Sequence, residues 1–431
     1  MKPCEYSCRT AEHVVSRRRF VETLAGVGAA AVMPGFGMFN SAAMAAELTR
    51  TQKRMLVINM AGGLSQLESW DPKPGTATGG PFRAIPTSVP GLHISELLPK
   101  TAKVMHHLAL IRGINTHEDD HGKGDYIMST GRRKTPAQDY PVLGAVVAKS
   151  LDPGDSALPG HIIITPGSGG GRNADSAYLG PKFGSVVLGN GKPPQFSERQ
   201  QGLAEEASSC ANDLRRKVND HFALRRRTAQ TEAYTQSYEQ GLELMKQREA
   251  FDITKEPAGD LERYGTHDFG RHCLLARRLI EKGITYVRVT HSNYDTHCEN
   301  FNFHFEQVGE FDGPFATLVT DLHDRGLLDH TLIVVLSEFG RTPSINQLYG
   351  RDHWSKAWSI CLGGAGVHRG AVIGATNATG TEVTERQVDG GHLFHTYLSA
   401  LGIKSTGHFT VAGQKMPIAD PAFEPIDELL T

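Results

Sequence analysis

The sequence predicts an α/β fold built on a mainly parallel β-sheet that is covered by helices on both faces. Short runs rich in Val, Ile and Leu alternate along the chain with amphipathic segments of helical periodicity. These runs are nearly continuous in apolar residues, which is typical of strands that are buried on both sides. The 431 residues are enough for one large core of this kind.

The first half of the chain supplies the first strands. RMLVINMAGG at 54–63 predicts a strand, and the loop 65–75 follows it. A helix signal then leads into a second strand, LALIRGI, and the loop 116–133 is expected to enter a helix near Gly124. A helix at YPVLGAVVAKSL precedes the short strand GHIIITP. The Gly-rich stretch 167–184 matches no phosphate-binding motif, so we expect an irregular connection there.

The character of the sequence changes between residues 197 and 251. This stretch is charged, poor in glycine and periodic like a helix, so we expect two antiparallel helices inserted beside the sheet. The alternation of helix and strand patterns then returns. Its strands are ITYVRVTH, which ends at His291, TLIVVLSE, which ends at Glu338, and SICLGGAG, and GGHLFHTYLSALGI predicts a last helix.

The first 45 residues have the features of an export signal. SRRRF at 16–20 precedes an apolar run, and the small residues AMA at 43–45 suit a cleavage site. The S-R-R-x-F start resembles a twin-arginine signal, so we expect the twin-arginine export machinery as a partner and a periplasmic or secreted protein. Residues 46–431 are then expected to form a single α/β domain that carries the helical insertion at 197–251.

Charge and composition exclude some classes of partner. Lys and Arg number 45 and Asp and Glu 47, for a net charge of -2, which argues against binding to nucleic acid or to an anionic membrane surface. No apolar run beyond the signal is long enough for a stable membrane span. The 20 histidines include many that surface and capping roles explain, but histidine is also the commonest metal ligand.

The densest group of chemically active side chains lies between His291 and Trp354. Several of these residues directly follow strand-like runs, and in an open α/β sheet the residues just past the carboxyl ends of strands line the ligand-binding crevice. Carboxylate and imidazole donors suit a divalent cation such as Zn, Mn, Mg or Ca. Besides His291, the candidate metal ligands are Asp295, His297, Glu338, Asp352 and His353.

The same segments carry a family resemblance. ITYVRV, YDTHCENF, TLIVVLSEFGRTPSIN and GRDHW, with MAGGLSQLESWDPKPG near the front, resemble the bacterial DUF1501 family, which is grouped with the alkaline phosphatase and sulfatase superfamily. The resemblance implies an alkaline-phosphatase-like, three-layer α/β/α sandwich with a metal site at the strand ends. It also implies a hydrolase-like protein that acts on sulfate or phosphate esters, with a small anionic ester or a carbohydrate as substrate.

The chain departs from the superfamily pattern where an aspartate should follow the first strand. Ser65 and Gln66 stand there instead, and Glu68 or Asp71 are the nearest carboxylates that could substitute.

A second departure concerns the nucleophile. HGKGDYIMSTG at 121–131 has the length and the T-G end of the sulfatase signature, but His121 stands where the nucleophilic Cys or Ser would be. We therefore expect His121 to act in acid–base catalysis, with His117 and Asp120 nearby as further ligands or partners. The two departures also leave room for an alternative, a non-catalytic periplasmic binding or assembly protein on a degenerate hydrolase scaffold.

Three cationic side chains are candidates for binding an anionic substrate. The candidates are Arg351, Arg341 and Lys123, which lie in the sequence blocks quoted above. A guanidinium binds sulfate, phosphate or carboxylate in a fork. Arg351 as a purely structural partner is the alternative.

The ligand candidates also have structural explanations. Asp295 could cap the helix that follows it, and His297 could be an ordinary loop histidine. Glu338 and Arg341 could form a structural ion pair, and Asp352 could orient His353 without touching a metal.

Overall fold

The computed structural model describes residues 51–153, 158–167, 174–193, 197, 202, 204–225 and 229–431. The fold lies within Gln52–Thr431. The expected signal peptide at 1–45 lies outside the described residues. None of the helices in the described ranges is both long enough and apolar enough to cross a membrane.

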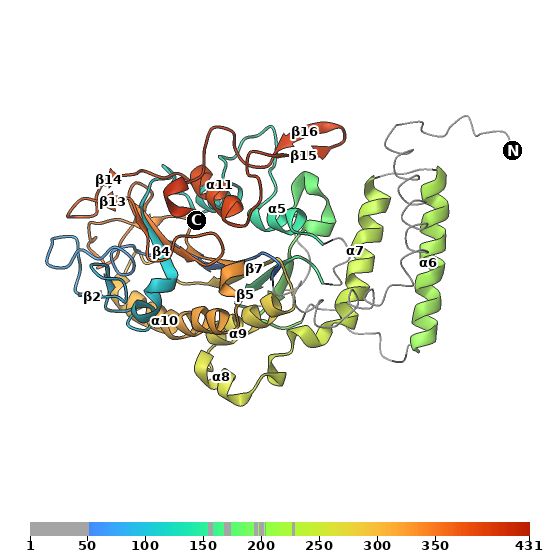
Figure 1. The fold of residues 1–431 in the computed structure, drawn as a ribbon, viewed down its shortest axis with the longest axis horizontal. Coiled ribbons are helices and arrows are strands. Elements are labelled where there is room, and N and C mark those ends of the chain that lie inside the picture. Colours follow the sequence, from blue (N-terminus) through green and yellow to red (C-terminus); the bar gives the residue numbers. More distant parts are fainter. Residues whose placement is uncertain are drawn as a thin grey trace, which may run out of the picture. The chain divides into compact units, whose positions relative to one another are not determined.

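An eight-stranded sheet forms the centre of the fold (Figure 1). Its strands follow the order β12-β4-β11-β8-β1-β7-β5-β6. Among these strands β11 is antiparallel to both neighbours, and every other pair is parallel. The carboxyl ends of the other strands therefore lie at one edge, and the predicted mainly parallel sheet is confirmed. The strands are β1 Arg54–Met60, β4 Leu108–Ile114, β5 His161–Thr165, β6 Val186–Gly189, β7 Tyr286–His291, β8 Thr331–Leu336, β11 Trp358–Gly363 and β12 Val372–Ile373.

The central strand β1 shows why the sheet needs helices on both sides. All seven of its residues are buried. Leu56 and Ile58 belong to one hydrophobic cluster, and the alternate residues Met55 and Val57 belong to another. Because successive side chains of a strand point to opposite faces, both faces of this sheet are apolar and both must be covered.

Helices from different parts of the chain cover the two faces. α9 and α10, with α3 and α8, supply residues to the cluster on one face, and α4, α5 and α11 supply residues to the cluster on the other. Figure 1 shows α9 and α10 on the side of the sheet opposite to α5 and α11. This is the predicted three-layer α/β/α sandwich. The helices are α3 Thr101–Val104, α4 His121–Thr130, α5 Leu143–Ser150, α8 Ala258–Tyr264, α9 Asp268–Glu281, α10 Asn300–Asp324 and α11 Gly390–Ala400.

The stretch at 197–251 contains two long helices, α6 Glu205–Arg225 and α7 Ala229–Lys246. Arg216 Nη2 lies 2.7 Å from Glu239 Oε2, and Asn219 Nδ2 donates to Thr235 Oγ1 at 3.1 Å. The contacts advance along α6 while they move backwards along α7, so the two helices are antiparallel.

Short two-stranded pairs lie outside the main sheet. They are β2 Ala84–Pro86 with β3 His93–Ser95, β9 Gly340–Arg341 with β10 His353–Trp354, β13 Ala375–Thr376 with β14 Val383–Glu385, and β15 His408–Val411 with β16 Gln414–Pro417. The antiparallel pair β9–β10 places His353 opposite Arg341. This short pair is not predicted by the sequence, and it fixes the position of one candidate ligand.

Two element boundaries differ from the sequence-based expectation in a way that matters for the site. α4 begins at His121 rather than near Gly124, because the Asp120 side chain caps it by accepting from the backbone nitrogen of Lys123 at 3.0 Å. β8 ends at Leu336, so Glu338 lies in the connection that follows. His121 therefore stands at the N-terminus of a helix.

A buried ion pair holds the connection after β1 against the segment before β10. Arg351 Nη2 lies 2.8 Å from Glu68 Oε1, its Nε lies 3.1 Å from Glu68 Oε2, and both side chains are fully buried. Asn300 Nδ2 donates to the same carboxylate at 3.1 Å. Two charges without access to water depend on each other, because each would otherwise stay uncompensated in the core.

We predict that Glu68→Ala will lower the free energy of unfolding by ~3–5 kcal/mol, because it leaves the Arg351 guanidinium buried without its carboxylate. Equilibrium unfolding in urea measures this. The control is Glu96→Ala, which breaks the surface pair between Arg83 Nε and Glu96 Oε2 at 2.8 Å and should cost less than about 1 kcal/mol. Equal losses in the two variants would contradict a special role for the buried pair.

Candidate metal centre

The candidate site lies at the carboxyl edge of the sheet, where several connections meet. Asp295 and His297 follow β7, Glu338 follows β8, and His353 lies in β10. His121 comes from the connection after β4 and is the first residue of α4. Parallel strands end at the same edge, so side chains far apart in the sequence are brought together here.

Three of these residues form a compact group of potential ligands. One donor atom from each of His121, Asp295 and His353 lies within 4.8 Å of the others. His121 Nε2 is 3.3 Å from Asp295 Oδ2, and His353 Nε2 is 3.2 Å from Asp295 Oδ1. In a tetrahedral site with metal–ligand bonds of about 2.0–2.2 Å, ligand atoms lie roughly 3.3 Å apart. The donor spacing therefore suits a single cation.

The imidazoles of His121 and His353 are both oriented through Nδ1. His121 Nδ1 lies 2.7 Å from Glu338 Oε1, and His353 Nδ1 lies 2.7 Å from the backbone oxygen of Asp119. A carboxylate and a carbonyl only accept hydrogen bonds, so each Nδ1 carries the hydrogen. The two Nε2 atoms face Asp295, and with the hydrogen on Nδ1 each Nε2 can offer its lone pair to a metal ion, which is how histidine ligands are commonly oriented.

His297 lies beside this group with a partner of its own. Its Nδ1 is 2.7 Å from Asp352 Oδ1, and its Nε2 is 3.1 Å from Asp295 Oδ1 and 3.0 Å from His353 Nε2. The hydrogen bond from His297 is the main cause that lowers the pKa of the Asp352 carboxyl. Asp352 therefore orients His297. The sequence had suggested that Asp352 either binds metal or orients His353.

The buried side chain of Arg341 binds the carboxylate of Asp295. Arg341 Nη2 donates to Asp295 Oδ1 at 2.6 Å, and the guanidinium is fully buried. Burial alone would raise the pKa of Asp295, but the hydrogen bond and charge of Arg341, with smaller contributions from His353 and His121, lower it to about 2. Asp295 is consequently an anion at any physiological pH.

Glu338 connects the site to the end of β1. Its Oε1 also accepts from the backbone nitrogen of Gly62 at 2.9 Å, and its Oε2 accepts from Ser337 Oγ at 3.0 Å. Gly62 has a φ of +115°, and a Cβ there would lie 2.5 Å from the backbone nitrogen of Asp295. Only glycine combines this conformation with so close an approach, so the connection after β1 can pack directly against the site.

The three cations expected to bind substrate are placed differently. Arg341 is buried and pairs with Asp295, and Arg351 is buried and pairs with Glu68. Lys123 is exposed on α4, with its Nζ 3.8 Å from Glu118 Oε1. The structure therefore engages both guanidinium groups in internal contacts and leaves Lys123 nearest to solvent.

The other carboxylates and histidines weighed from the sequence do not join the group of His121, Asp295 and His353. Asp71 Oδ1 lies 3.0 Å from Lys73 Nζ and 3.5 Å from Arg112 Nε. Asp120 caps α4. Asp295 does not cap α10, whose N-cap is Glu299 with no side-chain cap bond, and it is Asp295 rather than Glu338 that pairs with Arg341.

A protein family covers most of the described chain. The model of the family described as "Protein of unknown function (DUF1501)" matches residues 52–430. The chain belongs to the DUF1501 family. No curated protein matches this DUF1501 member.

Solved structures similar to this DUF1501 member share little of its sequence. The lipoteichoic acid synthase LtaP from Listeria monocytogenes is 8% identical, with a TM-score of 0.38, over 86% of this chain and 75% of that one. The PsFucS1 sulfatase from Pseudoalteromonas sp. is 13% identical, with a TM-score of 0.41, over 90% and 75%. The alkaline phosphatase from the Antarctic bacterium TAB5 is 14% identical, with a TM-score of 0.35, over 82% and 99%.

His291, the last residue of β7, faces away from the group in this DUF1501 member. Its side chain is buried beside Phe269, with ring centroids 4.4 Å apart, and its Nδ1 lies 2.8 Å from Tyr294 Oη. Burial lowers the pKa of His291 from 6.5 to about 3. The imidazole is therefore a neutral core residue of the folded protein.

We predict that this histidine makes the fold sensitive to acid. The folded pKa of about 3 lies below the unfolded value of 6.5. Below about pH 6 the unfolded state binds a proton that the folded state does not, so stability is full above pH 6.5 and is lost as the pH falls towards 3. His291→Gln should reduce the slope of unfolding free energy against pH by up to about 1.4 kcal/mol per pH unit between pH 6 and 4.

Urea unfolding at a series of pH values measures that slope. Replacement of the exposed His93 by Gln serves as the control variant. An unchanged slope in His291→Gln would show that the acid sensitivity has another source.

Proposed function

We propose that this protein is a metal-dependent hydrolase that acts on sulfate or phosphate esters, with His121, Asp295 and His353 holding a divalent cation. The observation that carries this proposal is the convergence of two imidazole Nε2 atoms on one carboxylate, each imidazole being held by an acceptor at Nδ1. The acceptors at Nδ1 leave both Nε2 atoms available to a cation that would lie between them and Asp295.

The donor set narrows the choice of metal. Two imidazole nitrogens and one carboxylate oxygen suit Zn or Mn better than Ca or Mg, which prefer oxygen ligands. Three protein ligands also leave one coordination position open, as catalytic zinc sites require. A bound cation of this kind would stabilise the negative charge that develops on the oxygens of the ester.

The residues around the cation would supply the rest of the chemistry. No Ser, Thr or Cys among the described residues makes a hydrogen bond to His121, Asp295, His297 or His353, so water is the nucleophile in this proposal. His297 Nε2 carries a lone pair, because Asp352 holds its Nδ1 hydrogen. The water oxygen bonds to sulfur or phosphorus and gives one proton to His297, while the bond to the ester oxygen breaks. The leaving alkoxide takes up a proton from solvent.

The anionic part of the substrate would meet positive potential at the N-terminus of α4. His121 is the first residue of this ten-residue helix, and the first turn of a helix attracts anions. Lys123, in the same turn and 65% exposed, adds a cation that can move towards the ligand. The buried Arg341 and Arg351 would act by holding Asp295 and the loops in place.

We predict that the purified protein binds about one equivalent of Zn or Mn and that His353→Ala loses it. His297→Ala should keep the metal, because His297 is an acid–base group and not a ligand in this proposal. Elemental analysis of the purified wild-type protein and of the two variants measures their metal content. Recovery of the protein from the periplasm or the medium tests the expected export by the twin-arginine machinery. His291→Gln, which alters a histidine outside the group, is the control.

Metal-free wild-type protein would contradict the proposal. Equal loss of metal in His297→Ala and His353→Ala would show that His297 is a ligand. Protein that remains in the cytoplasm would contradict the expected export. Stoichiometric metal without turnover of any sulfate or phosphate ester would favour the alternative, a non-catalytic binding or assembly protein, for which the lack of a Ser, Thr or Cys contact in the described site is the supporting observation.

We also predict that Asp352→Asn lowers kcat for 4-nitrophenyl sulfate or phosphate by about 10–100-fold, because the amide no longer fixes the hydrogen on His297 Nδ1. KM and metal content should change little, since neither Asp352 nor His297 holds the cation. Asp352→Glu, which restores the carboxylate, should recover part of the rate. Loss of metal in Asp352→Asn would contradict this positioning role.

A further inference from the structure

A cavity of about 380 Å³ lies away from the metal centre, at the far end of the same sheet edge. It is formed by the turn after β6, by the N-terminal half of α9, and by two short 3₁₀ helices, η5 Arg248–Phe251 and η6 Ile253–Lys255. Ligand-binding pockets commonly have volumes of roughly 300–1,000 Å³. The cavity is therefore large enough for a small ligand.

A buried histidine in this cavity lacks a partner. His272 is only 2% exposed, and its Nε2 makes no hydrogen bond to any residue that the structure describes. His272 Nε2 is therefore a buried polar atom at the wall of the cavity that none of the described residues satisfies.

In the neutral ring, the tautomer with its hydrogen on Nδ1 leaves Nε2 as a hydrogen-bond acceptor. Burial is the main cause of the lowered pKa of His272, which keeps the ring neutral. A buried acceptor without a donor costs free energy comparable to a lost hydrogen bond. A ligand that brings a hydroxyl group into the cavity would satisfy it.

The charges around the cavity favour an anion. Glu249 is neutralised by Lys255 at 2.8 Å, and the Asp252 carboxylate accepts from the backbone nitrogen and Oγ1 of Thr254 at 3.0 and 2.6 Å. The described residues provide no partner for Lys192 Nζ. The carboxylates of Glu249 and Asp252 thus both have nearby partners. The ammonium group of Lys192 remains as a positive charge at the cavity.

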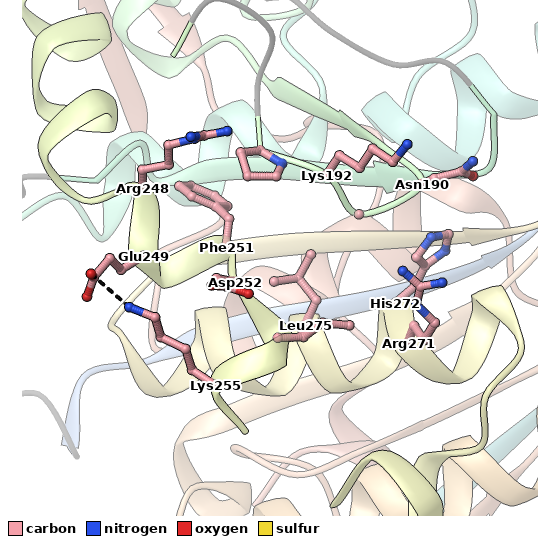
Figure 2. A pocket seen from close by; sticks show the side chains of 13 residues that line it. Asn190, Lys192, Arg248, Glu249, Phe251, Asp252, Lys255, Arg271, His272 and Leu275 are labelled. Atoms are coloured by element: carbon pink, nitrogen blue, oxygen red, sulfur yellow. Dashed lines mark ion pairs between the residues drawn. The ribbon is translucent and has the colours of Figure 1, made fainter. Parts of the chain in front are cut away.

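Figure 2 shows how these groups are distributed. Lys192, Asn190, Arg271 and His272 gather at one end of the cavity, the ion pair of Glu249 with Lys255 lies at the other end, and Phe251 and Leu275 lie between them. Among the described residues, the side chain of Arg271 has a single long ion-pair contact, with Nη1 3.9 Å from Asp268 Oδ1. Cationic groups and the acceptor nitrogen therefore stand together, next to an apolar wall.

We propose that this cavity binds an acidic sugar residue, with its carboxylate or sulfate at Lys192 and Arg271 and a hydroxyl group donating to His272 Nε2. A pyranose ring has hydroxyl donors on its rim and an apolar face of C–H groups, which Phe251 and Leu275 would contact. Neither a bare inorganic anion nor an uncharged apolar ligand would use all three features. The site does not depend on the metal centre or on the proposed hydrolysis.

The test is an NMR titration of the full protein with four probes: methyl β-D-glucuronide, glucose 6-sulfate, methyl β-D-glucoside and sodium sulfate. We expect the two acidic sugars to bind and to shift the imidazole ¹⁵N resonances of His272. The preferred acidic sugar shows whether the anion is a carboxylate or a sulfate. Binding should persist in His353→Ala, so its outcome is separate from that of the metal centre.

Lys192→Ala and Arg271→Ala should each weaken binding of the acidic sugar by about fivefold. His272→Phe, which keeps the ring volume and removes both nitrogens, should weaken it at least as much, and Lys282→Ala at the exposed C-terminal end of α9 is the control. If His272→Phe fails to fold, the ¹⁵N shift in the wild-type protein still decides the role of Nε2.

Three outcomes would overturn the proposal. They are no binding of either acidic sugar, equal binding of methyl β-D-glucoside or sodium sulfate, and equal affinity of the acidic sugar for wild-type protein, Lys192→Ala and Arg271→Ala.

Discussion

The candidate site depends on one buried cation, the guanidinium of Arg341. It donates to the backbone oxygens of Gly62, Gly63 and Arg351 and to the carboxylate of Asp295, and so it joins the connections after β1 and β7 to the segment before β10. A fully buried charge requires compensation, and Asp295 is the carboxylate that supplies it. The same carboxylate faces the imidazoles, so loop packing and ligand geometry are set by a single side chain.

Much of the fold could be predicted from the sequence because its signals are local. The apolar runs that form β1 and β8 are buried on both faces, and strands of that kind require a covered, mainly parallel sheet. That topology alone brings the residues after the strands to one edge. Asp295 and His353 meet there although they are 58 positions apart in the chain.

The roles of the individual residues could not be predicted, because they depend on which atom faces which partner. From the sequence, Arg351 is a candidate for anion binding. In the structure it pairs in the core with Glu68, which lies 283 positions earlier in the chain. Glu338 and Asp352 are chemically suited to bind metal, yet one carboxylate oxygen of each accepts a hydrogen bond from an imidazole Nδ1. His272 gives no signal at all, since a histidine on an amphipathic helix is ordinary until its neighbours are known.

The acceptors behind the three histidines differ in one respect that bears on how the sequence can vary. His121 and His297 depend on side-chain carboxylates, but His353 depends on the main-chain oxygen of residue 119. A peptide carbonyl is present whatever residue occupies that position. Evolution can therefore exchange Asp119 for many other amino acids without disturbing the ring of His353, whereas a change at Glu338 or Asp352 removes the support itself.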